Sequence, residues 1–305
     1  MSDWDLSSSY SMFSNVHSYM GVPMSRDVEN ADLVVMGIPY DLGTTGRAGT
    51  RHGPQAVRLA SSNLRWELRE KRWPWGFSAM ERLKIIDYGD LEFPPGESEG
   101  MVDEVVDSIE RIHGRGSKSL CFGGDHFVTL PVLKGVHRHR GSIALIQFDA
   151  HTDTYPESDK FDHGGMFYTA PRDGIIDPGH SIQLGIRTAY DRDTHEFKVI
   201  DAQALNDMSV EAVEAEIRRR IGDMPVYLTF DIDCLDPAYA PGTGTPVIGG
   251  ITTDKALKII RSLDGINVIG ADLVEVSPSY DHAEITALAG ATIGLELIHL
   301  MASSL

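Results

Sequence analysis

The sequence predicts a three-layer α/β/α fold, with a parallel sheet covered by helices on both faces. Two observations predict it. Short apolar runs alternate with segments of helical period along almost the whole chain, which is the pattern of repeated βαβ units with right-handed crossovers. Each run is also apolar throughout rather than at every second position, as expected for strands that are buried on both faces.

Eight apolar runs are predicted to form the strands. In chain order they span residues 33–38, 83–86, 119–122, 143–148, 181–184, 197–200, 226–230 and 266–269. The clearest helices have apolar residues at three-to-four spacing and span residues 101–112, 210–221 and 256–263. Thr252 and Thr253 are capping candidates at the start of the last helix, and Gly222 and Gly265 fit as C-terminal stops.

The apolar segment 287–301 is predicted to be a closing helix of the core. It is too short to span a bilayer, and it contains Glu296. No low-complexity linker, charge block or repeat divides the chain. We therefore expect a single domain over residues 1–305, with residues 1–30 as an N-terminal extension that packs on it.

The composition, 42% hydrophobic and 24% charged residues, indicates a globular protein that can bury a sizeable core. The formal net charge of -18 argues against a nucleic-acid-binding face and against docking on anionic membranes, and it favours a cationic substrate. Cys121 and Cys234 cannot form a disulfide framework, and the N-terminal segment has no basic region leading into an apolar one. We expect a cytoplasmic protein without nucleic-acid or membrane partners.

Acidic residues and histidines follow three of the predicted strands, at the point where each run ends. They are His126 after 119–122, Asp149, His151 and Asp153 after 143–148, and Asp231 and Asp233 after 226–230. Ligands of open α/β sheets bind outside the carboxyl ends of the strands, so we expect these side chains to meet at one edge. In an extended chain the two-residue spacing would also point the members of each segment in the same direction.

Six such groups at one edge would repel and desolvate one another unless cations held them. They are too many for one tetrahedral zinc site, but they suit two ions that share bridging carboxylates. The donors are mostly oxygen, with two imidazoles and no thiolate, which favours manganese over zinc or soft metals. Each segment alone would be typical of a solvated turn; their joint occurrence favours the metal.

Other candidates for chemistry are predicted to be structural. Cys234 should point away from Asp233 and into the core. We expect the histidines without a surrounding cluster to be surface or packing residues; these are His17, His113, His137, His139, His180, His195 and His299.

The three strand-end segments together resemble the three signatures of the ureohydrolases, the family of arginases and agmatinases. Supporting stretches are residues 46–54 and 241–246 and the segment Val274-Glu275-Val276-Ser277-Pro278. Residues 161–170 and 224–230 are similar in particular to the bacterial agmatinase branch, from which Gly165 departs by replacing a threonine. The resemblance runs from about residue 30 to the end of the chain.

The resemblance implies a central parallel sheet of eight strands, two Mn²⁺ per subunit and a homotrimer or homohexamer. It assigns His126, Asp149, Asp153 and Asp231 to one ion and Asp149, His151, Asp231 and Asp233 to the other. Asp149 and Asp231 would then bridge the two ions.

The implied reaction is the hydrolysis of agmatine, a small guanidino cation, to putrescine and urea. A water held between two divalent ions has a pKa lowered towards neutrality and is a nucleophile at pH 7. We expect Asp153 to orient this water, Glu275 to pair with the guanidinium, and His163 to carry a proton to the leaving amine. The mainly acidic loop between Asp153 and His163 suits the distal ammonium of agmatine.

Three alternatives stay open from the sequence. The first is hydrolysis of another guanidino compound such as 4-guanidinobutyrate, which would need a basic contact at its distal end. The second is a metal-dependent deacetylase-like or phosphoesterase activity, which His126 and Asp153 disfavour because they complete a second metal site. The third is a catalytically silent scaffold within an oligomer.

Overall fold

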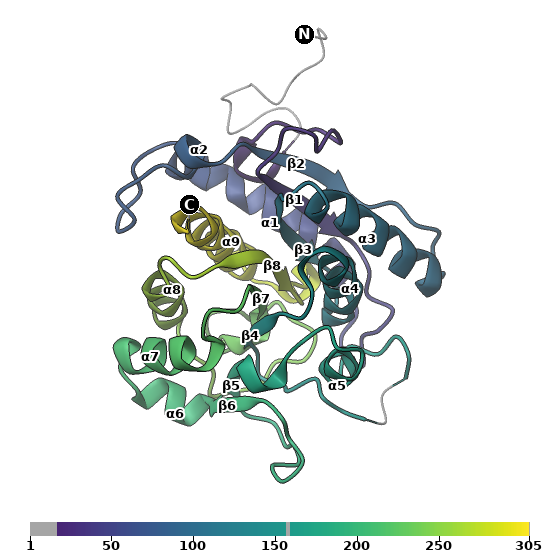
Figure 1. Cartoon of the computed structure of the whole chain (residues 1–305), viewed down its shortest axis with the longest axis vertical. Coiled ribbons are helices and arrows are strands. Elements are labelled where there is room, and N and C mark those ends of the chain that lie inside the picture. Colours follow the sequence, from purple (N-terminus) through teal and green to yellow (C-terminus); the bar gives the residue numbers. More distant parts are fainter. Residues whose placement is uncertain (1–16, 157–158, 305) are drawn as a thin grey trace, which may run out of the picture.

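A single sheet of eight parallel strands forms the centre of the computed structural model, which describes residues 17–156 and 159–304 (Figure 1). The strand order is β2-β1-β3-β8-β7-β4-β5-β6. The strands are β1 Leu33–Ile38, β2 Ile85–Asp90, β3 Lys118–Gly123, β4 Ala144–Phe148, β5 Ile182–Ile186, β6 Lys198–Asp201, β7 Val226–Asp231 and β8 Val268–Val274. The eight-stranded parallel sheet is thus confirmed.

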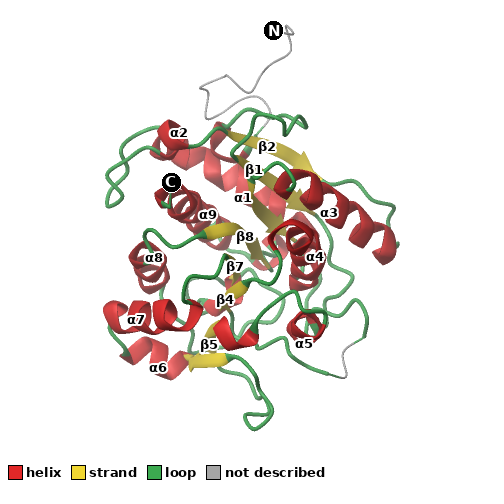
Figure 2. Ribbon diagram, in the orientation of Figure 1, coloured by secondary structure: helices red, strands yellow, loops and turns green. Residues whose placement is uncertain are grey.

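Helices cover both faces of this sheet (Figure 2). One face is covered by α1 Gly53–Ser61, α7 Val210–Ile221, α8 Thr253–Ser262 and α9 Ile285–Ser303, with the short α6 Ala202–Asp207 beside α7. The other is covered by α3 Ser98–His113, α4 Thr129–Arg140 and α5 Met166–Arg172. The remaining helix, α2 Ala79–Arg82, is a single turn before β2.

Six of the eight strands supply side chains to both hydrophobic clusters, which explains their continuous apolar character, whereas β5 and β6 contribute to only one of the clusters. In β1, Leu33 and Val35 lie in one cluster, and Val34 and Met36 lie in the other. All four are fully buried. A strand that is covered on both faces has no polar side, so its sequence shows no alternation.

Two predicted strands were misplaced, because polar residues continue them. The run 83–86 is apolar, but β2 extends into Asp87, a buried carboxylate that accepts a hydrogen bond from Arg58 at 2.8 Å. The run 266–269 is likewise only the start of β8, which goes on through the buried Asp272. The other strands lie within two residues of their predicted bounds.

The apolar C-terminal helix α9 closes the core as predicted. The expectation that it is too short to span a bilayer was wrong, because the helix has 19 residues and, by length and composition, is the one helix among the described residues that could cross a membrane. However, 78% of its apolar window is buried inside the protein. Glu296 is buried within it and accepts hydrogen bonds from Arg72 (2.8 Å), Arg261 (2.6 Å) and Trp75 (2.6 Å). These donors satisfy a carboxylate that would otherwise be costly to bury.

The predicted N-terminal extension packs on the sheet where it is described, from residue 17 onward; residues 1–16 lie outside the described part. Tyr19 is fully buried, and its ring centroid lies 4.6 Å from that of Phe122. Its backbone N–H donates to Asp87 at 2.7 Å. The assignment of the whole chain to a single domain stays a prediction.

His113, expected to be a surface or packing residue, is buried at the end of α3, where its Nε2 lies 3.0 Å from the Ser119 hydroxyl and its Nδ1 has no hydrogen-bond partner among the described residues. Burial, with repulsion from Arg140 and His139, lowers its pKa from the ordinary 6.5 to about 3. Below pH 6.5 the unfolded chain therefore binds a proton that the folded chain does not. The stability that depends on neutral His113 is present above pH 6.5 and is lost as the pH falls.

We expect His113→Gln to remove this part of the acid sensitivity. In the native protein the His113 contribution should cost about 2 kcal/mol of unfolding free energy between pH 6.5 and about pH 5. Urea unfolding of the metal-free protein at several pH values measures it. Parallel pH dependences for variant and native protein would contradict the expectation, whatever their offset at pH 7.5.

Candidate active site

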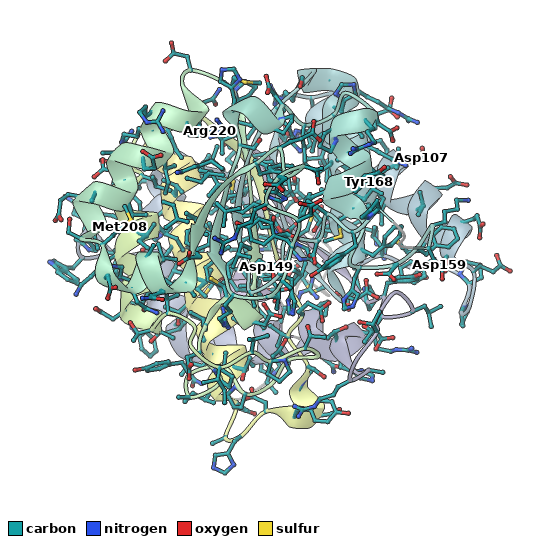
Figure 3. All side chains as sticks on the ribbon, turned by 90° about the horizontal axis from the view of Figure 1, so that it is seen from below. Asp107, Asp149, Asp159, Tyr168, Met208 and Arg220 are labelled. Atoms are coloured by element: carbon teal, nitrogen blue, oxygen red, sulfur yellow. The ribbon has the colours of Figure 1, made fainter. Side chains whose placement is uncertain are left out.

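The predicted site residues lie at the carboxyl ends of the four central strands, β3, β8, β7 and β4, which are neighbours in the sheet. His126 and Asp149 follow β3 and β4, Asp231 ends β7, and Glu275 follows β8. Figure 3 shows Asp149 near the middle of the molecule and Asp159 at its periphery. The convergence expected from strand ends is therefore present.

The backbone reaches this convergence through turns, and the predicted extended alternation is wrong. After β4 the chain bends, because the Asp149 carboxylate accepts the His151 N–H at 2.7 Å. Asp153 then adopts a left-handed φ of 50°. After β7 the Asp231 carboxylate accepts the Asp233 N–H at 2.8 Å, which starts a short 3-10 turn. Aspartates that follow strands favour such side-chain-to-backbone turns.

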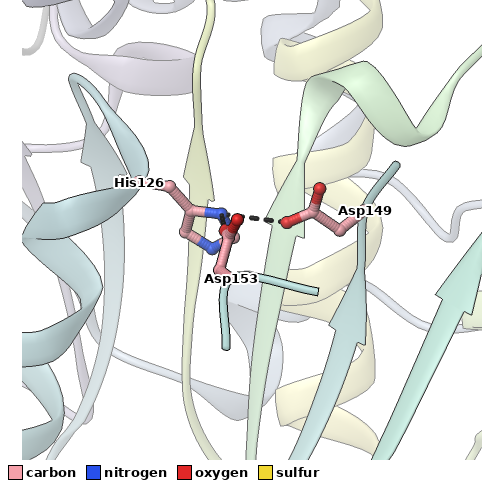
Figure 4. A group of neighbouring side chains, drawn as sticks. All are labelled: His126, Asp149 and Asp153. Atoms are coloured by element: carbon pink, nitrogen blue, oxygen red, sulfur yellow. Dashed lines mark ion pairs between the residues drawn. The ribbon is translucent and has the colours of Figure 1, made fainter. Parts of the chain in front are cut away.

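Two groups of ligand atoms form within this cluster, and Asp149 belongs to both. In one, His126 Nδ1 lies 3.0 Å from Asp149 Oδ2 and 2.9 Å from Asp153 Oδ2 (Figure 4). In the other, His151 Nδ1 lies 3.4 Å from Asp149 Oδ1 and 3.1 Å from Asp233 Oδ2. A carboxylate with one oxygen in each group is placed to bridge two cations.

Asp231 also belongs to the first group. Its Oδ2 lies 3.3 Å from His126 Nδ1, which makes it the third carboxylate around that nitrogen. His126 and the carboxylates of this group are at most 6% exposed. The six predicted ligands thus form one continuous cluster, which is buried except at the half-buried His151.

The His126 ring is oriented by a buried chain of hydrogen bonds. Its Nε2 lies 2.8 Å from the Thr229 hydroxyl, which donates to Asp272 at 2.5 Å. Because that hydroxyl proton is used, Thr229 accepts a hydrogen from His126 Nε2. The neutral ring therefore presents the lone pair of Nδ1 to the carboxylates, as a metal-binding imidazole must.

The electrostatics of the cluster call for positive charge. Burial and the neighbouring Asp233 and Asp149 raise the pKa of Asp231 well above its usual range, and burial and Asp149 raise that of Asp153 to about 6. Burial alone would lower the pKa of His151, but Asp149 and Asp233 outweigh it and raise that pKa to about 12. In the metal-free protein, bound protons offset the negative charge of the carboxylates. Bound metal ions would relieve the same repulsion between the carboxylates. The donor set fits divalent metal ions.

A cavity of about 360 Å³ opens onto this cluster. Its described lining residues are Thr45, His151, Asp153, Tyr155, Asp162, His163, Gly164, Asp231 and Thr245. The cavity therefore brings His163 and the acidic loop next to the cluster.

His163 is held between Glu275 and Thr45. Its Nδ1 lies 2.8 Å from Glu275 Oε1, and its Nε2 accepts the Thr45 N–H at 3.1 Å. Burial would lower the pKa of His163, but Glu275 outweighs burial and raises it to about 9. The Thr45 N–H can only donate, so it favours the neutral ring. These opposing contacts suit a group that must both gain and lose a proton.

Glu275 lies beneath His163 rather than among the described residues of the cavity wall, and it is 1% exposed. Its Oε1 accepts the His126 N–H at 3.0 Å, whereas its Oε2 has no hydrogen-bond partner among the described residues. Its φ of 64° is strained for a residue with a side chain. An unpaired buried carboxylate oxygen on a strained backbone indicates a functional position.

The sequence interpretation missed residues that support the cluster from outside. Arg187 donates hydrogen bonds of 2.5 to 3.3 Å to five backbone carbonyls, which belong to Gly185, Asp233, Cys234, Leu235 and Val247. Contacts to backbone carbonyls do not depend on which residues accept them, so no sequence pattern indicates them. Thr229 and Asp272 did leave one, because each is a polar residue inside an otherwise apolar strand.

Three other predictions concern residues near the site. Cys234 is fully buried, and its Sγ lies against the Leu184 carbonyl, so it belongs to the core as predicted. Gly165 has φ -119°, which any residue can adopt, so the backbone there does not require glycine. His195 is more than the packing residue that was expected, because its Nε2 lies 2.7 Å from the buried Gln183.

Comparison with known proteins agrees with this geometry. The model of the arginase family matches residues 31–299. An agmatinase from Edwardsiella ictaluri is 54% identical over 296 residues, which cover 96% of each chain. The crystal structure of a hypothetical agmatinase from Burkholderia thailandensis has a TM-score of 0.91 at 44% identity, covering 96% of this chain and 92% of that one. Proclavaminate amidino hydrolase from Streptomyces clavuligerus has a TM-score of 0.90 at 32% identity, covering 97% and 100%. The chain belongs to the arginase family.

Proposed function

We propose that this protein hydrolyses agmatine to putrescine and urea, using two bound Mn²⁺. As a member of the arginase family it is a hydrolase of an amidine C–N bond. The assignment of agmatine as the substrate is supported by the Edwardsiella ictaluri agmatinase, which is 54% identical over nearly the full length of both chains. The observation that carries the proposal is a buried cluster in which Asp149 is shared by two sets of ligand atoms beside a cavity.

The proposed ligands of one ion are His126, Asp149, Asp153 and Asp231, and those of the other are Asp149, His151, Asp231 and Asp233. Four carboxylates and two imidazoles without a thiolate are a hard donor set, which supports manganese. When bound, two such cations lower the pKa of a shared water and so supply a nucleophile at neutral pH.

The protein's own groups would then direct the reaction. Asp153 would orient the attacking water, a role supported by its position on the cavity wall with Oδ2 2.9 Å from His126 Nδ1. Glu275 would give its unpaired Oε2 to a guanidinium N–H, forming a charge-assisted hydrogen bond. His163 would deliver a proton from its ring to the departing amine, because it lies on the wall of the same cavity.

The charge of the cavity wall supports an amine substrate over an amino acid. Asp162 and Tyr155 line the cavity together with the ligands, and none of its described lining residues is lysine or arginine. Agmatine would present its ammonium to this wall, whereas arginine adds an α-carboxylate that needs donors or a cation. A carboxylate near Asp162 would be repelled.

Urea release from agmatine, arginine and 4-guanidinobutyrate, measured side by side with added Mn²⁺, tests this assignment. We expect agmatine to be turned over at least about a hundredfold more efficiently than either acid, which corresponds to about 3 kcal/mol in transition-state binding. Turnover of 4-guanidinobutyrate alone would replace the proposed substrate with a guanidino acid. Appreciable turnover of arginine alone would reject the agmatine assignment.

We expect His163→Ala to lower kcat by about a hundredfold while the protein keeps its metal ions. The reason is that His163 contacts Glu275 and Thr45 and is not among the proposed ligands. Steady-state kinetics and metal analysis of the same sample measure both effects. A variant depleted of manganese would contradict the proton-transfer role.

A cytoplasmic location and a homotrimer or homohexamer are further parts of the proposal. Both cysteines are free, buried thiols, which suits a reducing compartment. Large apolar side chains that are exposed in the single chain, such as Ile248 at 86%, support association with other copies. Analytical ultracentrifugation measures the assembly.

A further inference from the structure

Two glutamines lie side by side in the buried part of the sheet, behind the candidate metal ligands. Gln147 on β4 and Gln183 on β5 are partners in the strand register, and both are fully buried. The Gln183 amide donates to Gln147 Oε1 at 2.6 Å. Burying a pair of amides among apolar neighbours costs free energy unless each of their polar atoms has a hydrogen-bond partner. The other contacts of the two amides supply these partners.

Each amide nitrogen also donates to the segment that carries the ligands. Gln147 Nε2 donates to Asp149 Oδ2 at 2.8 Å and to the His151 carbonyl at 3.2 Å. Gln183 Nε2 donates to the Thr152 carbonyl at 2.8 Å. Backbone carbonyls only accept hydrogen bonds, so the nitrogen end of each amide must face this segment. Both hydrogens of each amide are then used.

His195 completes the chain at its outer end. The oxygen of the Gln183 amide faces His195 Nε2 at 2.7 Å, and an amide oxygen can only accept, so the ring donates from Nε2. Its ring is partly exposed and lines a separate cavity of about 430 Å³, with Tyr190 and Phe197 beside it. Every hydrogen bond in this chain therefore points the same way, from His195 towards Asp149.

We infer that Gln147, Gln183 and His195 form an amide relay that holds residues 149–153 in their cation-binding shape. Its contacts reach Asp149 directly and the turn through the carbonyls of His151 and Thr152. This turn needs such support, because it leaves the strand and passes through the left-handed Asp153. The relay residues are positioning residues, since none of them belongs to the proposed ligand set. The inference rests on the proposed function, because it takes the cluster to bind cations.

Equilibrium Mn²⁺ binding to metal-free protein tests the relay, with Gln183→Glu as the first variant. Glutamate has nearly the same shape, but its carboxylate cannot donate to Gln147 Oε1 or to the Thr152 carbonyl. We expect Mn²⁺ affinity to fall about 10- to 100-fold, as for other groups that orient metal ligands. Thr194→Ala, which changes the wall of the outer cavity and removes a hydrogen bond to Asp191 rather than one to a relay side chain, should keep native affinity.

Substitutions of His195, at the outer end of the relay, allow a second test that distinguishes a lost hydrogen bond from a general loss of packing. His195→Ala should lower Mn²⁺ affinity about tenfold. Imidazole should restore affinity in this variant, because the adjacent cavity admits it to the vacated position, and it should not restore Gln183→Glu. His195→Gln, which keeps a donor at the reach of Nε2, should bind Mn²⁺ better than His195→Ala.

The outcomes separate the inference from the proposed function. Native affinity in Gln183→Glu, or a His195→Ala variant that is weakened but not rescued by imidazole or by the glutamine, would overturn the relay. A native protein that binds no Mn²⁺ would instead reject the proposed function. The unfolding temperature of each metal-free variant, measured in parallel, identifies any variant that fails to fold, and Gln147→Glu then takes its place.

Discussion

Asp153→Asn is expected to remove most of the turnover of agmatine and to weaken Mn²⁺ binding. We expect kcat/KM to fall about a thousandfold, equivalent to about 4 kcal/mol of transition-state stabilisation. Asp153 is buried, its Oδ2 lies 2.9 Å from His126 Nδ1, and it lines the cavity. The substitution therefore removes one negative charge from the ligand set and the charged group that would orient the attacking water. Steady-state urea release and equilibrium Mn²⁺ binding measure the two effects.

The backbone should tolerate this change, which makes the experiment specific. Asp153 has φ 50°, and asparagine adopts the left-handed region more readily than most residues. Asp159→Asn is the matched control and should retain native turnover, because Asp159 is an exposed carboxylate that is not among the described lining residues of the cavity. If Asp153→Asn kept most of the activity at full metal occupancy, its proposed place in the site would be wrong.

Glu275→Gln should lower kcat/KM by about a hundredfold or more while metal content stays native. The amide keeps the shape of the side chain and can still accept the His126 N–H, but it loses the negative charge offered to the guanidinium. The pairing with His163 Nδ1, which raises the pKa of that ring, is weakened as well. Because His163 must be protonated to deliver its proton, the alkaline limb of the pH–rate profile should move to lower pH. Kinetics across a pH series, together with metal analysis, measure these changes.

Glu99→Gln serves as the control for Glu275→Gln, because Glu99 is an exposed carboxylate on the wall of a different cavity. It should leave both kcat/KM and metal content unchanged. Loss of manganese from Glu275→Gln would show that Glu275 supports the ligands rather than the substrate, since its Oε1 also accepts the His126 N–H.

The sequence predicted the sheet well because its strands are apolar on both faces. The run 33–38 coincides with β1, and its neighbouring residues face opposite clusters. The predicted bounds were wrong where a buried carboxylate ends the apolar run of the sequence although the strand continues, as at Asp87 in β2 and Asp272 in β8. Such residues are stabilised by partners far away in the chain, for example Arg58 for Asp87, and local sequence does not reveal them.

The grouping of the site was predictable, but its local geometry was not. Parallel strands end at one edge, so His126, Asp149 and Asp231 could be expected to meet. The directions of the ligand side chains are set by turns in which aspartate carboxylates accept backbone N–H groups. These turns are found where an extended, alternating chain was predicted. Gln183 was missed because its role depends on the pairing of β4 with β5, which no spacing within one segment encodes.

Titration of the metal-free protein with Mn²⁺, followed by the rate of urea release from agmatine, tests the central claim most directly. The shared position of Asp149 predicts that activity rises steeply with the second ion and saturates at about two equivalents per chain. Saturation at one equivalent per chain, or no urea at any Mn²⁺ concentration, would contradict a two-metal site that acts on agmatine.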